Sequence, residues 1–276
     1  MVNALYLNTH FAVTRMPYYL RLKSLMGKII KPRIQIDFEN QFYQVKTVNC
    51  PEELAEVLRL RFEVFYREFS QLPSLFSFLP YDLDTHDFLC DHLVVKDKAS
   101  GKIVASYRLL LSGAAKRFYS EGEFILDDFL RHPETVLELG RACVHRDFRS
   151  GAVISLLWKG LLQYATRSGA RYLFGCSSIP KKDFGSVTQI LADLEKKNAL
   201  IDDFEIGVQR ACVPPATLDL TPSDSPKGMS SLMGMYLLAG AKFSRAMAWD
   251  GDMECLDLLT ILDMTKLPAS FERKFG

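Results

Sequence analysis

The sequence predicts a mixed α/β protein in which helices cover one central sheet. Three observations predict this class. Strand-like and helix-like segments alternate along the chain, and two apolar runs at 92–95 and 103–110 flank the turn residues 97–102, which indicates an antiparallel hairpin. The stretch LELGRACVHRDFRSGAVISLLWKG, residues 137–160, passes from an extended apolar run through a short loop into a helix. This combination is typical of a single mixed sheet with helices on its faces.

The remaining elements follow from periodicity and from capping and breaking residues. Pro51 begins a helix that reaches about residue 69, with apolar residues at helical spacing, and two prolines between residues 71 and 81 predict a loop. Asp183 is expected to cap a helix that ends near residue 198. The other predicted elements are strands at 137–144 and 171–176, helices at 153–168 and 230–241, a turn-rich connector at 214–226 and extended segments from 242 to about 264.

Length and composition predict one folded domain with an extension. The chain has 276 residues, of which 48% are hydrophobic and 24% are charged, as in ordinary globular proteins. We expect a basic N-terminal arm over 1–44 and a domain over 45–276. The formal net charge of +1 argues against a dedicated nucleic-acid binder, which would carry a basic excess.

The N-terminal arm has six basic residues before the first acidic residue, Asp37. They are Arg15, Arg21, Lys23, Lys28, Lys31 and Arg33. Because apolar residues lie between them, the arm could rest on an anionic membrane as an amphipathic segment, or it could pack on the domain with its charges in solvent. The acid-poor start also resembles a transit peptide, but nothing favours that interpretation.

Cysteine spacing and hydropathy predict a location in the reducing cytoplasm. If the N-terminal arm binds an anionic membrane, the protein would also contact the inner face of the membrane peripherally. The six cysteines include no C-x-x-C pair, so neither a zinc site nor a disulfide framework is expected. No apolar run approaches the roughly 20 residues that span a bilayer, and no signal-peptide core opens the chain. The five histidines have no metal-ligand spacing, so no metal is expected.

The loop between the strand at 137–144 and the following helix is a candidate phosphate site. The first amide groups of a helix lack intrahelical partners and carry the positive end of the helix dipole, so they bind phosphate oxygens well. Ser150, Gly151 and Ala152 would let a ligand approach the backbone, and Arg149 adds a charge. Neither a dinucleotide fingerprint nor an NTP-binding P-loop is present, which favours a phosphate-bearing group-transfer cofactor. Many such loops bind nothing, and that alternative stays open.

Four aspartates fall within ten residues before the strand at 92–95: Asp82, Asp84, Asp87 and Asp91. Grouped carboxylates repel one another unless they lie in solvent or pair with cations. The cluster is therefore either a solvated turn with capping aspartates or a set of partners for Arg61, Arg108 and Arg141.

Glu138 lies in an apolar strand, where a carboxylate is seldom found without a partner. A buried glutamate beside a cleft has a raised proton affinity, which suits a general base acting on an amine. The alternative is a structural ion pair with Arg141. If Glu138 is a general base, the substitution Glu138→Gln is expected to lower turnover and to leave thermal stability nearly unchanged.

The order of the elements and several motifs resemble the GNAT superfamily, and within it the ornithine lipid N-acyltransferases, also called hemolysin-like acyltransferases. The matching stretches are LRLRFEVFYREF, YDLDTHDFLCDHLVV, IVASYRLL, LELGRACVHRDFRSGAVISLLWKG, RYLFGCSS and LMGMYLLAGAKFSRAMAWDGDMECLDLLTILDM. The resemblance runs from about Val45 to the C-terminus and extends more distantly to N-acyl-homoserine lactone synthases and long-chain N-acyl amino acid synthases. It implies a mainly antiparallel central sheet with two splayed strands, flanked by helices.

The resemblance also implies an activity. Such enzymes transfer a long-chain acyl group, often 3-hydroxylated, from acyl carrier protein to the α-amine of ornithine and so make a lyso-aminolipid. The acyl-phosphopantetheine of the carrier would be a co-substrate, and no cofactor would be bound permanently. The alternatives are an acyl-CoA-dependent N-acyltransferase of another amine and a non-catalytic acyl-binding regulator.

Carried over position by position, the resemblance implies three sets of site residues. The catalytic set is Glu138, Arg108, Arg141, Asp84 and Asp87. The set that binds the pantetheine of the acyl carrier is Cys143, Val144, Arg149, Ser150, Gly151 and Ala152, and the substrate-binding pair is Arg61 and Phe65. Glu138 would receive the amine proton, Asp84 and Asp87 would hold cationic groups or order the lid, the two arginines would steady them, and amides near Ala142 and Cys143 would stabilise the oxyanion.

Two departures from the family pattern bear on the substrates. The usual acyl-CoA loop reads Arg/Gln-x-x-Gly-x-Gly/Ala, whereas this chain has RSGAVI at 149–154, which suits a single phosphate and so favours acyl carrier protein over free CoA. Where ornithine enzymes usually have Lys-Gly-Tyr-Leu-Arg, this chain has GMYLL at 234–238, which leaves the acceptor open.

Overall fold

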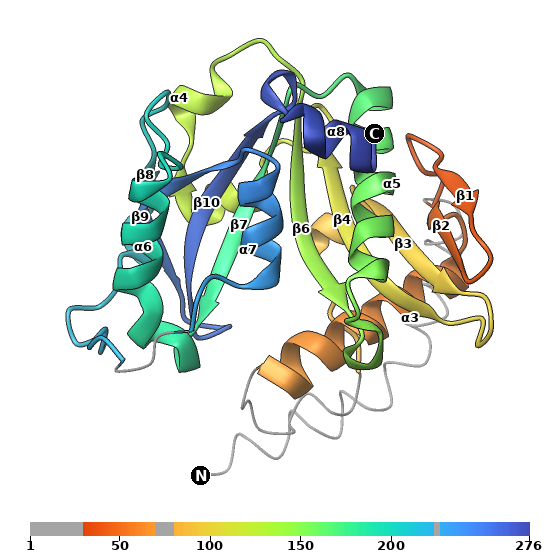
Figure 1. Ribbon diagram of the computed structural model, residues 1–276, viewed down its shortest axis with the longest axis horizontal. Helices are drawn as coiled ribbons and strands as arrows, with labels where there is room; N and C mark the ends of the chain where they lie inside the picture. Colours follow the sequence, from red (N-terminus) through yellow and green to blue (C-terminus); the bar gives the residue numbers. More distant parts are fainter. Residues whose placement is uncertain (1–29, 70–79, 224–226) are drawn as a thin grey trace, which may run out of the picture.

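The computed structural model describes residues 30–69, 80–223 and 227–276, and the part of the arm before residue 30 lies outside these ranges. Its centre is an eight-stranded sheet with the order β1-β2-β3-β4-β6-β7-β10-β9 (Figure 1). The strands are β1 (Asp37–Glu39), β2 (Tyr43–Thr47), β3 (Asp91–Asp97), β4 (Ile103–Leu111), β6 (Val136–Val144), β7 (Tyr172–Pro180), β9 (Lys242–Asp250) and β10 (Cys255–Asp263). All neighbours pair antiparallel except β6 and β7, so the predicted mixed, mainly antiparallel sheet is confirmed.

Helices cover both faces of the sheet. They are α3 (Pro51–Phe62), which continues as π-helical turns over Glu63–Phe69, then α4 (Asp127–Leu130), α5 (Ala152–Ser168), α6 (Val187–Lys196), α7 (Ser231–Leu238) and α8 (Ala269–Phe275). Because side chains alternate along a strand, Leu93 and Val95 pack with α5 while Val94, between them, packs with α3 on the opposite face. Figure 1 shows α5, α7 and α8 on the near side of the sheet.

The face of α3 also carries the small two-stranded sheet of β5 (Phe124–Ile125) and β8 (Gly207–Val208). Phe124 and Phe129 pack there against Phe174 of β7 and Leu259 of β10. This face therefore has two covers, α3 over β3, β4 and β6, and the segment around β5 over β7 and β10. The candidate catalytic residues lie between the two covers.

Most predicted elements are confirmed, including the hairpin, now β3 and β4, and the helix capped by Ser230, whose hydroxyl accepts a hydrogen bond from the backbone N–H of Met233. The prediction for Asp183 was wrong. A 3-10 segment, Lys181–Ser186, precedes α6, and Ser186 occupies the N-cap position. Asp183 lies four residues before the first residue of α6, inside this 3-10 segment, and its Oδ1 lies 3.1 Å from Nζ of Lys227 instead.

The sheet begins inside the segment that we assigned to the N-terminal arm. β1 and β2 form a hairpin around Asn40, whose side-chain oxygen accepts hydrogen bonds from the backbone of Phe42 and Tyr43. β2 then pairs with β3. The strands are short and carry charged residues, as edge strands do, so their apolar pattern is too weak to be recognised in the sequence.

The parallel strands β6 and β7 pair only at their beginnings. Their register covers three residue pairs and ends at Glu138 opposite Phe174, although β6 continues to Val144 and β7 to Pro180. The two strands therefore diverge, as the resemblance implied. Gly175 lies where they separate, and a Cβ atom there would stand 2.1 Å from the carbonyl oxygen of Leu139, so only glycine permits this approach.

A β-bulge in β6 follows directly. Gly140 pairs with Arg108 and Cys143 pairs with Ser106, so Arg141 and Ala142 together face one residue of β4. Arg141 has φ of +50°, an uncommon conformation for a residue other than glycine. The extra residue turns the Arg141 side chain to the face that carries Glu138; in a regular strand, residues 138 and 141 would point to opposite faces.

Candidate active site

Arg61 of α3 lies at the centre of the acidic cluster. It is fully buried, and it donates from Nε to Asp82 at 2.7 Å and from Nη1 to Asp87 at 2.6 Å. Both aspartates are also buried. The forked guanidinium can serve two carboxylates at once, which a lysine ammonium cannot do with the same geometry. Asp82 and Asp87 are therefore buried partners of an arginine and not part of a solvated turn. The capping role in the alternative is nevertheless present, because Asp84 caps the 3-10 turn Thr85–Phe88 and Asp87 accepts a hydrogen bond from the backbone N–H of Asp84.

Arg108 and Arg141 complete the network. Nη1 of Arg108 lies 2.5 Å from Asp84 and 3.4 Å from Asp87, while Nε of Arg141 lies 3.2 Å from Asp82. Three guanidinium groups thus face three carboxylates, so the network is balanced. Asp91, the fourth aspartate, lies apart and accepts hydrogen bonds from the Tyr164 hydroxyl and the backbone of Arg33.

The same network sets the protonation states. Burial alone would raise the pKa of Asp87, but Arg61, His92 and Arg108 outweigh it and hold this pKa well below its usual range. The pKa of Asp84 is lowered in the same way, since Arg108 outweighs burial. His92 lies beside Asp87, and burial lowers its pKa to about 4, so it is neutral near pH 7.

Two aromatic rings line the arginines. Tyr119 lies under both, with its ring centre 5.3 Å from the guanidinium carbon of Arg108 and 5.1 Å from that of Arg141. Phe65 approaches Arg141 from the other side, at 6.0 Å. Arg61 and Phe65, one helical turn apart, therefore reach the same site, Arg61 through the aspartates and Phe65 through Arg141.

Glu138 is buried but does not pair with Arg141. Its Oε2 accepts a hydrogen bond from the backbone N–H of Tyr119 at 2.8 Å, and its Oε1 accepts two from Ser120, from the backbone at 2.7 Å and from the hydroxyl at 2.6 Å. Burial raises the pKa of Glu138, and the hydrogen bonds from Ser120 and Tyr119 oppose this effect. Among the described residues, Oε2 accepts a hydrogen bond from Tyr119 alone and so retains a lone pair for another donor.

The loop after β6 forms a helix start with an uncapped backbone. Gly151 is the N-cap residue of α5, has φ of +87° and offers no side-chain cap, so a ligand can reach the first amides of the helix. Nη2 of Arg149 lies 2.9 Å from Glu68, and its Nε donates to the carbonyl of Val144. Ser150 and Ala152 are exposed beside Gly151.

The resemblance implied that backbone N–H groups near Ala142 and Cys143 stabilise the oxyanion, and the structure changes this expectation for Cys143. His145 donates its N–H to Val104 of β4 at 2.8 Å, and alternation along the strand directs the N–H of Cys143 to the same side. The N–H of Val144 points to the other edge, which β7 has left. The Cys143 side chain is also buried, with Sγ 3.5 Å from Ser106. Cys143 therefore turns away from the opening, and Val144 faces it.

Sequence reasoning missed three groups near Glu138: Tyr119, Ser120 and Glu123. They belong to the 3-10 turn Tyr119–Gly122 and the residue after it, a region for which we predicted no element. The signal that could have found them is Glu138 itself, because a buried carboxylate requires donors from some neighbouring segment.

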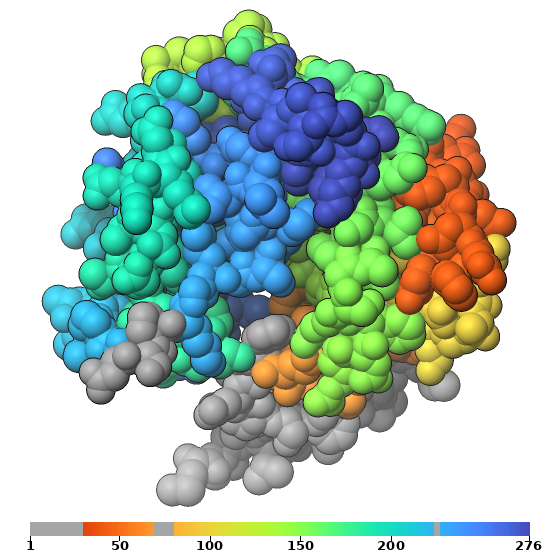
Figure 2. Space-filling model, viewed as in Figure 1, coloured from red at the N-terminus to blue at the C-terminus, as the bar shows by residue number. Residues whose placement is uncertain are grey.

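A cavity of about 220 Å³ lies next to Asp87 and Asp91. Its wall includes Asp87, His92 and Arg33, and the Nδ1 atom of His92 has no hydrogen-bond partner there. Neither Glu138 nor the divergence of β6 and β7 borders it. In the space-filling view, the surface is hollowed between α7 and the first turns of α5, over that divergence (Figure 2).

Comparison with known proteins agrees with this architecture. A family model described as the acetyltransferase (GNAT) domain matches residues 60–159, which include the end of α3, the aspartates, β6 and the start of α5. The fold and site thus define an acyltransferase of the GNAT class.

Curated relatives give the particular family. An L-ornithine N(alpha)-acyltransferase of Rhizobium meliloti (strain 1021) is 30% identical over 250 residues, which cover 84% of each chain. Another, from Agrobacterium fabrum (strain C58 / ATCC 33970), is 28% identical over 275 residues, covering 90% of this chain and 92% of the relative. The chain belongs to the L-ornithine N(alpha)-acyltransferase family.

Solved structures include more distant matches. The acyl-homoserine-lactone synthase LasI is 12% identical, with a TM-score of 0.46, over 88% of this chain and 95% of that chain. None of the helices in the described ranges is both long enough and apolar enough to cross a bilayer.

Proposed function

We propose that this acyltransferase moves a long-chain acyl group, 3-hydroxylated or not, from acyl carrier protein to the α-amine of ornithine and releases a lyso-aminolipid. The observation that carries the proposal is the divergence of β6 and β7 beside Glu138. An extended thioester arm can add to the open edge of β6 as a strand would, with its reacting carbonyl near the bulge. The family relationship supports ornithine as the acceptor.

The reaction consists of one substitution at the thioester carbon. The deprotonated α-amine attacks the carbonyl, the C–N bond forms, the C–S bond breaks and the thiol of phosphopantetheine leaves with a proton. Glu138 would take the amine proton at Oε2, directly or through water. The amides of Ala142 and Val144 would stabilise the oxyanion. No resident cofactor is needed for these steps.

The roles of the remaining residues follow their contacts. Asp84 and Asp87 would order the segment over the site, since Arg108 and Arg61 already neutralise them. Arg141 and Phe65 would form the acceptor wall. The first amides of α5 and Arg149 would meet the phosphate of the carrier, with Ser150, Gly151 and Ala152 giving access to the backbone.

The donor is tested directly. The purified protein is incubated with 3-hydroxyacyl carrier protein or with the matching CoA thioester, together with a panel of amino acids, and products are identified by mass spectrometry. We expect N-acylornithine with the carrier-bound donor and at least tenfold less with the CoA thioester. A higher rate with CoA would favour the acyl-CoA-dependent alternative, and bound acyl groups without any acylated amine would favour a non-catalytic regulator.

The basic arm would place the enzyme next to the membrane that takes up its product, at the cytoplasmic face. Arg15, Arg21, Lys23 and Lys28 lie outside the described residues. Arg33 packs on the domain, where its Nη1 donates to the carbonyl of Leu89 at 2.7 Å. Sedimentation of the full chain with anionic and with neutral vesicles tests the membrane contact.

A further inference from the structure

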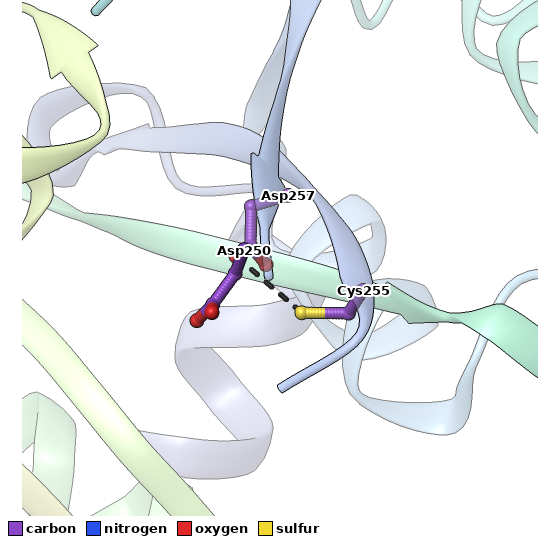
Figure 3. A group of neighbouring side chains, drawn as sticks. All are labelled: Asp250, Cys255 and Asp257. Carbon is purple, nitrogen blue, oxygen red and sulfur yellow. Dashed lines mark hydrogen bonds between the residues drawn. The ribbon is translucent and has the colours of Figure 1, made fainter. Parts of the chain in front are cut away.

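A second group of carboxyls lies on the same face of the sheet as Glu138, farther toward β9 and β10. We call Glu123, Asp250 and Asp257 the carboxyl cluster. Asp257 and Cys255 are two residues apart on β10, and Asp250 of β9 is the cross-strand partner of Cys255, so the three share one face. Figure 3 shows Asp250, Cys255 and Asp257 gathered at this end of the hairpin. Glu123 reaches the cluster from the cover formed by β5.

The carboxyl cluster differs from the aspartates around Arg61 because no cation neutralises it. Within the described ranges, no lysine or arginine forms an ion pair with any of its members. Neutral groups supply its donors: Sγ of Cys176 lies 3.3 Å from Oε2 of Glu123, Sγ of Cys255 lies 3.7 Å from Oδ2 of Asp257, and the Ser178 side chain also hydrogen-bonds to Asp257. The Oδ1 atom of Asp257 is buried without a hydrogen-bond partner, in a side chain that is 2% exposed.

Without a bound cation, the grouped carboxyls of the cluster destabilise the folded protein. Burial and the charge of Asp257 raise the pKa of Glu123 to about 8, and burial also raises the pKa of Asp257. The two carboxyls therefore retain a proton near neutral pH, which limits their repulsion. A bound cation would replace that proton and supply the missing partner of Asp257.

The carboxyl cluster is connected to the reaction site. The Ser120 hydroxyl, which donates to Glu138, lies 3.5 Å from Sγ of Cys176, and that thiol contacts Glu123. Along this face of the sheet the order is therefore arginines, then Glu138, then unpaired carboxyls. A diamino acid has the complementary order: a carboxylate, an α-amine and a terminal ammonium group.

We propose that the carboxyl cluster binds the side-chain ammonium group of a basic amino acid acceptor, while the α-amine of that acceptor faces Glu138. The proposal rests on the proposed N-acyltransferase function and assigns acceptor selectivity to Glu123 and Asp257.

A divalent metal ion is the competing occupant. One ligand atom each from Asp250, Cys255 and Asp257 lies within 4.8 Å of the others, and zinc accepts this donor set. However, zinc requires a thiolate, and burial followed by the charge of Asp257 raises the pKa of the Cys255 thiol well above its usual range. An ammonium group needs only acceptors, and Asp257 offers a free one.

The test compares ornithine with norvaline, which has the same carbon chain but no side-chain amine. For the wild type we expect a higher kcat/KM with ornithine. Glu123→Gln should lower kcat/KM for ornithine by about 10- to 100-fold, the usual effect of losing a charge-assisted hydrogen bond, while the value for norvaline changes less than about twofold. Asp257→Asn should act in the same direction. Asp252→Asn, an exposed carboxylate in the same hairpin, is the matched control and should change neither value.

Melting temperatures distinguish a role of Glu123 in acceptor binding from a structural role. The groups that face Glu123 are Asp257, Asp250, Cys176, Cys212, Tyr119 and Ser120. Because none of them is a cation, Glu123→Gln should melt at the same or a higher temperature than the wild type at pH 8.5. A lower melting temperature together with equal losses for both acceptors would show a structural role and overturn the proposal.

Three further outcomes are decisive. Ornithine and 1,4-diaminobutane, without an acyl donor, should raise the melting temperature of the wild type but not of Glu123→Gln; this result would support the carboxyl cluster even if no acylated amine were formed. Active enzyme whose ornithine-to-norvaline ratio is unchanged in Glu123→Gln would overturn the proposal and leave the acyltransferase function intact. Stoichiometric zinc that is lost in Asp257→Asn, with unchanged selectivity, would replace the ammonium group with a metal ion.

Discussion

Glu138 and Ser120 share two hydrogen bonds, one from the backbone N–H and one from the hydroxyl of Ser120, both to Oε1 of Glu138. A third, from Tyr119, reaches Oε2. The carboxylate therefore fastens the turn over the arginines to the sheet, in addition to the base role that we propose. Removing the negative charge of Glu138 should therefore affect both the stability of the protein and its turnover.

Glu138→Gln is expected to lower turnover by about 100-fold and also to lower the free energy of unfolding by about 1–3 kcal/mol. The amide group can accept on one side only, so an N–H would face the donor of Tyr119 or those of Ser120. This replaces the expectation from the sequence that stability would hardly change. Ser120→Ala is the control: it removes one donor and keeps both backbone bonds, so its loss of stability should be smaller. Thermal melts and steady-state rates of both variants measure the difference, and an unchanged melt for Glu138→Gln would contradict the prediction.

Arg61→Met should lower the free energy of unfolding by about 3–5 kcal/mol, because it leaves Asp82 and Asp87 buried without their cation. Arg59→Met is the matched control one half-turn away. Within the described ranges, the Arg59 side chain makes polar and ring contacts with Tyr81 alone, so its loss should be about 1 kcal/mol or less. Urea unfolding followed by fluorescence compares the two, and similar losses would argue against the central place of Arg61.

His92 should make the protein less stable as the pH falls from about 6.5 to about 4. Its pKa is lowered to about 4 by burial, so in this range the unfolded chain binds a proton that the folded protein does not. The slope from this group is at most about 1.4 kcal/mol per pH unit. His92→Gln should flatten it. Melts of the wild type and of this variant at half-unit intervals of pH test this, and equal slopes in the two proteins would rule out His92 as the source.

Gly175→Ala should reduce the yield of folded protein or lower the free energy of unfolding by about 3 kcal/mol or more, since the new methyl group would overlap the carbonyl of Leu139. The strands can relieve the overlap only by separating where Glu138 is held. Gly234→Ala, in α7 with open space around it, should stabilise by about 0.5–1 kcal/mol. Soluble yield and melting temperature distinguish the variants, and a Gly175→Ala protein as stable as the wild type would show that the strands are not in close contact there.

The sequence predicted the fold class because its signals are local, whereas the set of candidate site residues came from the family resemblance. Alternation in 92–110 predicts the β3–β4 hairpin, but the four aspartates left two interpretations open, a solvated turn with capping aspartates and ion pairs with three arginines. Which arginine meets which aspartate depends on the packing of α3, a tertiary contact without a local signal. The donors to Glu138 were missed for the same reason, since the turn at Tyr119 has no pattern of its own.

The bulge at Arg141 could not be predicted either, because arginine rarely adopts a positive φ and the surrounding residues are those of an ordinary strand. Its effect is large. Without it, Glu138 and Arg141 would lie on opposite faces, and the predicted single site would be divided by the sheet.

The same bulge shifts the alternation of side chains along β6 by one residue. Upstream of it, even-numbered residues such as Glu138 and Gly140 face the arginines; downstream, odd-numbered Cys143 does so, and Val144 turns its amide to the opening. Deletion of Ala142 would restore a regular strand in which Cys143 still pairs with Ser106, so the residues beyond the bulge would keep their faces and only Arg141 would turn away from Glu138. The extra residue therefore serves a single side chain, and its removal should cost the site one guanidinium group while the approach to α5 stays as it is.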